Sequence, residues 1–167
     1  MKGKIYSVKS KKNVKTDSDP YLSKESHCGV ALCKRCRGIY HNKHWSFDEN
    51  KYNAFLKKRD ITFVVCPACQ KIKDGYPEGV VTLRGDFLKK HKEEILNLIK
   101  NEEDRAKGFN PLERIINIDE SDEKIVVTTT NEKIAQRIGR EVYKAYQGKI
   151  EYKWSHDNRM VRVEWTR

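Results

Sequence analysis

Two Cys-x-x-Cys pairs, Cys33/Cys36 and Cys66/Cys69, constrain the fold of this chain more than any other feature. The two-residue spacing lets one tight turn direct both sulfurs of a pair at the same ion, and four thiolates suit Zn²⁺ in a structural site. A thioredoxin-type redox motif is a single pair beside a βαβ unit, which is not the context here. The pattern therefore predicts a structural zinc site with these four ligands; iron–sulfur ligation and redox use are the alternatives.

The turns that carry the two pairs have sequence signals of their own. Gly38 follows the first pair, and we expect it to supply the positive φ of a tight turn. Pro67 fixes the second turn, and a short helix after Cys66 would present its positive end to the thiolates. Because 29 residues separate the pairs, we expect a treble-clef-like or ribbon-like module with inserted structure. Four cysteines already fill the ligand shell, which leaves three residues outside the predicted site: Cys28, His41 and His44.

The net charge of +11 is concentrated in one half of the chain. Residues 1–76 carry 17 Lys and Arg against 7 Asp and Glu, which accounts for +10, whereas residues 77–167 carry 18 against 17. Such an uneven distribution of positive charge favours a polyanionic partner for the N-terminal half, and nucleic acid is the main candidate. The alternative is a basic surface that only increases solubility.

Composition and periodicity divide the 167 residues into four segments. With 37% apolar and 35% charged residues, a single large core is not expected. There is no run of about 18 apolar residues and no signal peptide, so we expect a cytoplasmic protein without a membrane partner. The predicted organisation is a basic disordered arm at 1–27, a zinc module at 28–84, a connecting amphipathic helix at 85–110 and an α+β domain at 111–167.

Helix caps and periodicity give the local structure of the zinc module and the connecting helix. The capping-box spacing of Ser46 and Glu49 predicts a helix around residues 47–58, and residues 61–66 are typical of a strand. Asp86 is the expected cap of the connecting helix. The apolar stripe of that helix is predicted to contain Leu88, His91, Ile95 and Ile99.

The C-terminal segment predicts a β-β-α-β-β layer, mostly antiparallel, with its helix on one face. Strands are expected at 112–119 and 124–130, and Thr129 and Glu132 form a capping box for a helix that ends near Tyr146. Gly139 inside this helix suggests close packing against the sheet. The predicted core face of the helix consists of Ile134, Ile138, Val142 and Ala145.

The last two strands, 148–154 and 159–165, are expected to form a hairpin around the four residues SHDN. One register matches two apolar pairs and two opposite-charge pairs without any like-charge conflict. In that register Trp154 faces Arg159, Tyr152 faces Val161, Ile150 faces Val163, Glu151 faces Arg162 and Lys149 faces Glu164.

Basic and aromatic residues crowd the cysteine module, a combination that suits RNA, because cations bind phosphates and aromatic rings stack on unpaired bases. The candidate RNA-binding residues of this region are Lys34, Arg35, Arg37, Tyr40, Lys43, Trp45, Lys57, Lys58, Arg59, Lys71 and Lys73. A second candidate surface is a basic stripe on the C-terminal helix, although such stripes also occur on ordinary solvated helices. Its residues are Lys133, Arg137, Arg140 and Lys144.

No pattern in the sequence indicates catalysis. A closed four-cysteine site leaves no open position for water or substrate, so catalytic zinc is disfavoured. The chain has no phosphate-binding glycine loop, nucleophile elbow or spaced pair of carboxylates. We therefore expect a monomeric, non-enzymatic protein without a small-molecule substrate.

Five stretches of residues 31–167 carry a family resemblance: "CKRCRGIYHNKHW", "CPACQKIKDGYPEGVVTLRGDFLKKHKEEILNLIKNEE", "NPLERIINI", "VVTTTNEKIAQRIGREVYKAYQGKIEYKW" and "VRVEW". Together they resemble small prokaryotic proteins grouped with the nonsense-mediated decay protein three family, the export adaptor of large ribosomal subunits. The resemblance implies zinc at the four cysteines and binding to the large subunit. This chain is far shorter, has fewer cysteine pairs and shows no shuttling segment, so export itself is not implied.

These observations predict a zinc-stabilised, ribosome-associated protein that binds rRNA without catalysis. Subunit maturation, quality control and ribosome hibernation all fit, and the sequence does not choose among them. The alternative is a zinc-containing transcriptional regulator that binds DNA.

Overall fold

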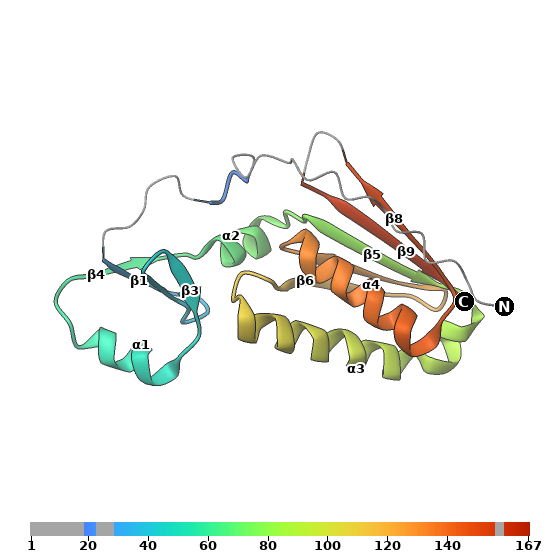
Figure 1. Ribbon diagram of the computed structural model, residues 1–167, viewed down its shortest axis with the longest axis horizontal. Helices are drawn as coiled ribbons and strands as arrows, with labels where there is room; N and C mark the ends of the chain where they lie inside the picture. Colours follow the sequence, from blue (N-terminus) through green and yellow to red (C-terminus); the bar gives the residue numbers. More distant parts are fainter. Residues whose placement is uncertain (1–18, 23–28, 156–158) are drawn as a thin grey trace.

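The computed structural model describes residues 19–22, 29–155 and 159–167. A module with the cysteines lies at one end of the molecule, and a larger five-stranded sheet, with two long helices on one face, lies at the other (Figure 1). The predicted α+β class is therefore confirmed. None of the helices in the described residues has a stretch long and apolar enough to cross a membrane.

The cysteine module is built on a four-stranded sheet with the order β3-β2-β1-β4. Its strands are β1 (Val30–Cys33), β2 (Ile39–His41), β3 (His44–Ser46) and β4 (Ile61–Val64). Strands β1, β2 and β3 pair antiparallel, whereas β4 returns parallel to β1 after the short helix α1 (Glu49–Leu56). In this parallel register Cys33 pairs with Val64, so the first Cys pair begins beside the strand that leads to the second.

Helix α2 (Pro67–Asp74) connects the module to the larger sheet (Figure 1). That sheet has the order β6-β7-β5-β9-β8. Its strands are β5 (Gly79–Arg84), β6 (Ile115–Glu120), β7 (Lys124–Thr129), β8 (Lys149–Trp154) and β9 (Val161–Thr166). The predicted β-β-α-β-β layer is present as β6, β7, helix α4 (Glu132–Tyr146), β8 and β9.

Strand β5 was not predicted, and it occupies the centre of the larger sheet. The sequence assigned residues 79–84 to the zinc module, but the strand pairs antiparallel with β7 and parallel with β9. Val81 and Leu83 point into the core, while Arg84 is exposed. Pro77 before the strand, Gly79 at its first position and Gly85 after it leave an alternating pattern that is too short to be recognised.

The core of the larger part lies between the sheet and the helices α3 (Asp86–Phe109) and α4 (Figure 1). The predicted stripe of α3 is buried at Leu88, Ile95 and Ile99, whereas His91 is half-buried and interrupts the helix at φ −122° and ψ 22°. Its ring stacks on Phe87, with the ring centroids 4.1 Å apart.

On α4 the predicted core residues Ile134, Ile138 and Val142 are buried, but Ala145 is exposed.

Three predicted helix caps are wrong by one or two residues. Asp48, not Ser46, caps α1 and accepts a hydrogen bond from the Lys51 amide at 2.9 Å. Asn131, not Thr129, caps α4, because the Thr129 hydroxyl bonds to the Asn131 carbonyl oxygen at 2.9 Å instead. Gly85 precedes α3, so Asp86 is already its first helical residue.

The β8–β9 hairpin has a register two residues away from the predicted one. The Ser155 amide donates to the Met160 carbonyl oxygen at 3.0 Å, so the connection is longer than expected. The observed register allows Trp165 to be fully buried, with its indole donating to the Gln147 carbonyl oxygen at 2.6 Å. The observed pairs are Trp154 with Val161, Lys153 with Arg162, Tyr152 with Val163, Glu151 with Glu164, Ile150 with Trp165 and Lys149 with Thr166.

This register places like charges opposite each other, which the prediction had avoided. Because the shift is an even number of residues, each side chain keeps its predicted face. Two ion pairs relieve the repulsion. Lys153 Nζ lies 2.7 Å from Glu164 Oε2 across the two strands, and Lys149 Nζ lies 2.8 Å from Glu151 Oε1 on the same strand. Each of the two facing glutamates thus has a lysine partner, so the like charges do not prevent this register.

Gly139 packs directly against the sheet, as predicted. A Cβ at this position would lie 2.5 Å from Val163 Cγ1 and 3.2 Å from Ile150 Cδ1. We expect Gly139→Ala to lower the free energy of unfolding by about 1–3 kcal/mol, because overpacking exceeds the gain of about 1 kcal/mol in helix propensity. The control is Gly108→Ala on α3, where a Cβ meets nothing within 4 Å. Urea unfolding measures both, and equal stabilities would contradict the close packing.

Candidate metal centre

The four predicted ligands come together at the edge of the cysteine module. The sulfurs of Cys33, Cys36, Cys66 and Cys69 all lie within 4.8 Å of one another, and Cys36 Sγ is 3.6 Å from Cys66 Sγ. Three of the residues are buried, and Cys36 is half-buried. This arrangement can hold one metal ion surrounded by sulfur alone.

The first pair sits on a turn that ends strand β1. The Arg37 amide donates to the Cys33 carbonyl oxygen at 3.1 Å, and Arg37 itself has the positive φ of 62° that we had assigned to Gly38. Gly38 serves a different purpose: a Cβ there would lie 3.3 Å from Cys36 Sγ and 3.4 Å from the Trp45 ring. The glycine therefore lets the sulfur and the indole approach the backbone closely.

The second pair sits at the start of α2, as predicted. Cys66 is the N-cap, Pro67 is the first helical residue, and the Cys69 amide donates to Cys66 Sγ at 3.4 Å. The Cys66 amide donates to Cys33 Sγ at 3.3 Å, which joins the two turns. Backbone N–H groups and the positive end of a helix both favour thiolates at this position.

The thiols titrate as one group of interacting sites. Hydrogen bonding from Cys36 lowers the pKa of Cys33, whereas the Cys33 sulfur raises the pKa of both Cys36 and Cys66. Four thiolates so close together repel one another, so some of the thiols keep their protons when no cation is bound. The donor set therefore fits a divalent ion that would neutralise this charge and displace the protons.

Arg114 is a residue of this centre that the sequence analysis missed. Its Nη1 donates to Cys69 Sγ at 3.3 Å, although it belongs to the segment before β6. Burial alone would lower the pKa of this guanidinium, but the negative charge of Cys69 and its neighbours raises it. Nothing in the local pattern marks Arg114, because its contact with Cys69 spans 45 residues.

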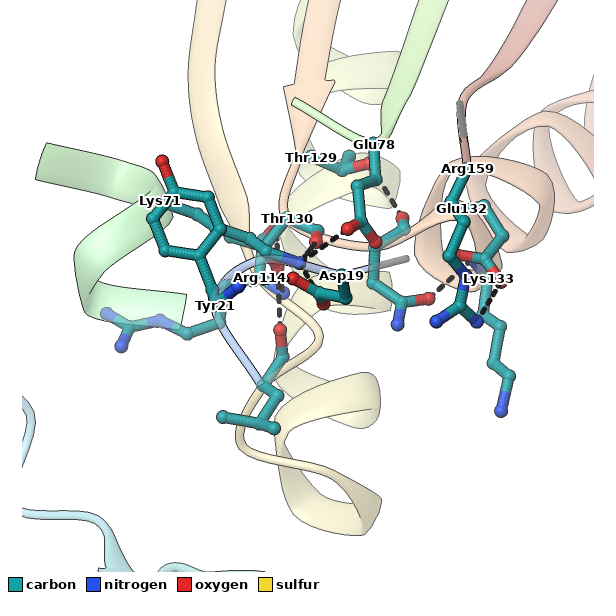
Figure 2. A network of polar contacts seen from close by, with 12 residues as sticks. Asp19, Tyr21, Lys71, Glu78, Arg114, Thr129, Thr130, Glu132, Lys133 and Arg159 are labelled. Carbon is teal, nitrogen blue, oxygen red and sulfur yellow. Dashed lines mark hydrogen bonds and ion pairs between the residues drawn. The ribbon is translucent and has the colours of Figure 1, made fainter. Parts of the chain in front are cut away.

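Lys71, a predicted RNA-binding residue, is buried, so its ammonium is not available at the surface. It is only 4% exposed, and its Nζ lies 2.7 Å from both Asp19 Oδ2 and Glu78 Oε1 (Figure 2). The ammonium also donates to the Thr130 carbonyl oxygen at 3.2 Å. Desolvation raises the pKa of Glu78, an effect that the Lys71 charge opposes. Lys71 thus joins α2 to the larger sheet.

The prediction of a disordered arm over residues 1–27 does not hold for residues 19–22. Asp19 pairs with Lys71, and the Tyr21 hydroxyl donates to Asp74 Oδ2 at 3.0 Å. The Tyr21 and Tyr76 rings lie 5.2 Å apart. Residues 1–18, residues 23–28 with Cys28, and residues 156–158 lie outside the described residues.

The remaining basic residues of the module are on its surface. Those predicted to bind RNA and found exposed are Lys34, Arg35, Arg37, Lys43, Lys57, Lys58, Arg59 and Lys73. Arg35 also reaches the Cys69 carbonyl oxygen at 3.4 Å, and Arg37 lies 3.6 Å from a Glu49 carboxylate oxygen. The predicted aromatic residues Tyr40 and Trp45 pack together with their ring centroids 5.3 Å apart.

The second predicted basic surface lies on α4 of the larger part. Lys133, Arg140 and Lys144 are exposed, and Arg137 is half-buried. Lys144 Nζ lies 2.7 Å from Glu141 Oε1, so its charge is partly compensated. This stripe therefore carries less uncompensated positive charge than the basic surface of the cysteine module.

Comparison with known proteins identifies no relative: no protein-family model, no curated protein and no solved structure matches this chain. The resemblance to the nonsense-mediated decay protein three family therefore stays a prediction.

Proposed function

We propose that this chain is a zinc protein that binds ribosomes through rRNA, mainly on the large subunit, and acts without catalysis in subunit maturation, quality control or hibernation. The observation that carries the proposal is the set of exposed cations around the four-cysteine cluster. A rigid cationic platform of this kind suits a folded polyanion.

Zinc is the metal that best fits the centre. An all-sulfur set of four ligands disfavours hard cations such as Mg²⁺ and Ca²⁺, and a closed shell leaves no position for water or substrate. Among its described residues, the cysteine module has two small apolar clusters, one of which contains the cysteines themselves. A metal would therefore supply the folding free energy that this core lacks. Metal analysis should find one zinc ion per chain; an iron chromophore would contradict this assignment.

RNA is favoured by the position of charge and aromatic groups in the module. Lys57, Lys58 and Arg59 follow α1 consecutively and are exposed, and none of them has an ion pair among the described residues. Tyr40 and Trp45 lie in the same module as these cations. Both rings are half-buried, and cations near partly exposed aromatic rings are typical of proteins that bind single-stranded or looped RNA. The stripe on α4 would give a second, weaker contact.

The class of function can be tested by sedimentation with ribosomes. We expect the wild-type protein to move with the 50S or 70S peaks of a sucrose gradient, in growing or stationary cells. Reversing three charges with Lys57→Glu, Lys58→Glu and Arg59→Glu should reduce this association at least tenfold. It should also make the binding less dependent on salt, because about three counterion-releasing contacts are lost.

The matched control reverses three exposed cations of the larger part, Lys90→Glu, Lys100→Glu and Lys124→Glu, which likewise have no ion pair among the described residues. This variant has the same net charge and should keep most of its ribosome affinity. A protein that stays at the top of the gradient in both growth phases would contradict the proposal. Salt-dependent, sequence-preferring binding to duplex DNA without rRNA binding would instead indicate the transcriptional regulator.

A further inference from the structure

A cavity of about 580 Å³ lies beside the metal centre, where the cysteine module meets the larger part. Its walls come from the β2–β3 hairpin, the end of β4, the first half of α2, the segment after α3 and residues 21–22. Clefts of roughly 300–1,000 Å³ between two structural units are the usual place for small ligands. The volume is therefore sufficient for one nucleotide.

One wall of the cavity is aromatic. Tyr40 and Trp45 are direct partners in the β2–β3 ladder, so both rings project from the same face, with their planes at 50°. Tyr21 lines the cavity as well. Such rings give a planar base a stacking surface that does not depend on its sequence.

The charge of the lining favours an anion. The described lining residues include Lys43 and His44, but no Asp or Glu. Lys43 is exposed at the tip of the hairpin, where Asn42 and Lys43 both have a positive φ, of 52° and 62°. This two-residue turn holds the ammonium at the rim, where a phosphate next to a buried base would lie.

The amide side chains of Gln70 and Asn110 add one hydrogen-bond acceptor and one donor to the cavity. Gln70 Nε2 donates to the Val65 carbonyl oxygen at 3.0 Å, and Asn110 Oδ1 accepts from the Leu112 amide at 3.1 Å. These bonds hold the side chains in place and leave Gln70 Oε1 and Asn110 Nδ2 without a partner in the described part of the chain. An acceptor and a donor together match the edge of a nucleobase.

From this combination we infer that the cavity binds the base of one unpaired ribonucleotide. The base stacks on Trp45 and Tyr40, Gln70 and Asn110 contact its polar edge, and Lys43 binds an adjacent phosphate. The inference rests on the proposed RNA-binding function and adds that the protein recognises a single-stranded or flipped-out nucleotide, not only the charge of a duplex.

The test compares binding of a single-stranded RNA hexamer with binding of a duplex of the same sequence, using the full chain with its metal. The hexamer should bind at least tenfold more tightly than the duplex, whose bases are paired. Trp45→Leu should weaken hexamer binding roughly tenfold, whereas Trp45→Phe should keep most of it, because a ring still stacks. The matched control is Trp154→Leu, since Trp154 is 40% exposed on the β8–β9 hairpin, outside the cavity.

Two further measurements distinguish loss of base binding from misfolding of the variant and from failure of the proposed ribosome association. Trp45 packs against the cysteine cluster, so the metal content of Trp45→Leu is measured, and Lys43→Gln at the exposed rim gives an independent loss of affinity. Equal hexamer affinities for Trp45→Leu and Trp154→Leu, or equal affinities for hexamer and duplex, would overturn the inference. If the wild type still moves with ribosomes in that case, only this inference fails; absence of ribosome association would overturn the proposed function instead.

Discussion

Removal of the proposed zinc ion is expected to unfold the cysteine module and abolish the proposed ribosome binding, while the five-stranded sheet stays folded. Structural zinc contributes on the order of 10 kcal/mol to the folding of small modules at neutral pH. The module here has no comparable source of stability, because its apolar clusters are small. The larger part has its own core, which includes Trp165, Leu83 and Ile99. Limited proteolysis after chelation should therefore cut within residues 29–76 and spare the C-terminal part.

The same result is expected for Cys66→Ser, which removes one ligand and the N-cap of α2. Cys28→Ser is the matched control, because the fifth cysteine lies outside the predicted ligand set; it should keep one metal ion per chain. Zinc added back after chelation should restore the protease resistance and the ribosome binding of the wild type. An apoprotein with an unchanged cleavage pattern and unchanged ribosome affinity would show that the metal is not structural.

Lys71→Ala is expected to have the largest effect of any single charge substitution. The side chains of Asp19 and Glu78 are 6% and 5% exposed, and both lie 2.7 Å from the ammonium. Removing Lys71 leaves two buried carboxylates without a counter-charge, which typically costs about 3–5 kcal/mol. The free energy of unfolding from urea denaturation measures this loss.

Lys73→Ala is the natural control, since this lysine lies on the same helix but is exposed. It should change stability by no more than about 0.5 kcal/mol. Combining Lys71→Met with Asp19→Asn and Glu78→Gln removes all three charges and should recover most of the lost stability. If Lys71→Ala and Lys73→Ala were equally stable, the buried network would not hold the structure together.

The four-cysteine cluster and most helices and strands could be predicted because their signals are local. Two cysteines separated by two residues share one turn wherever that turn lies, and the apolar period of α4 is visible within its own residues. The helix caps were less accurate, because several polar residues near each helix start compete for the same amides. Strand β5 has a visible alternation at Val81 and Leu83, yet six residues next to glycines are too few to reveal a central strand.

The sequence by itself determined the four-cysteine cluster, the α+β class and the concentration of positive charge in the N-terminal half. The tertiary structure alone decided that Lys71 is buried, that Arg114 donates to Cys69 Sγ, that residues 19–22 dock on α2, and that the last hairpin is shifted by two residues. Each of these depends on partners far apart in the chain: 52 residues separate Lys71 from Asp19, and 45 separate Arg114 from Cys69. Local patterns set which segments form helices and strands, but the choice of long-range partners follows from how whole elements pack and which charges they bury together.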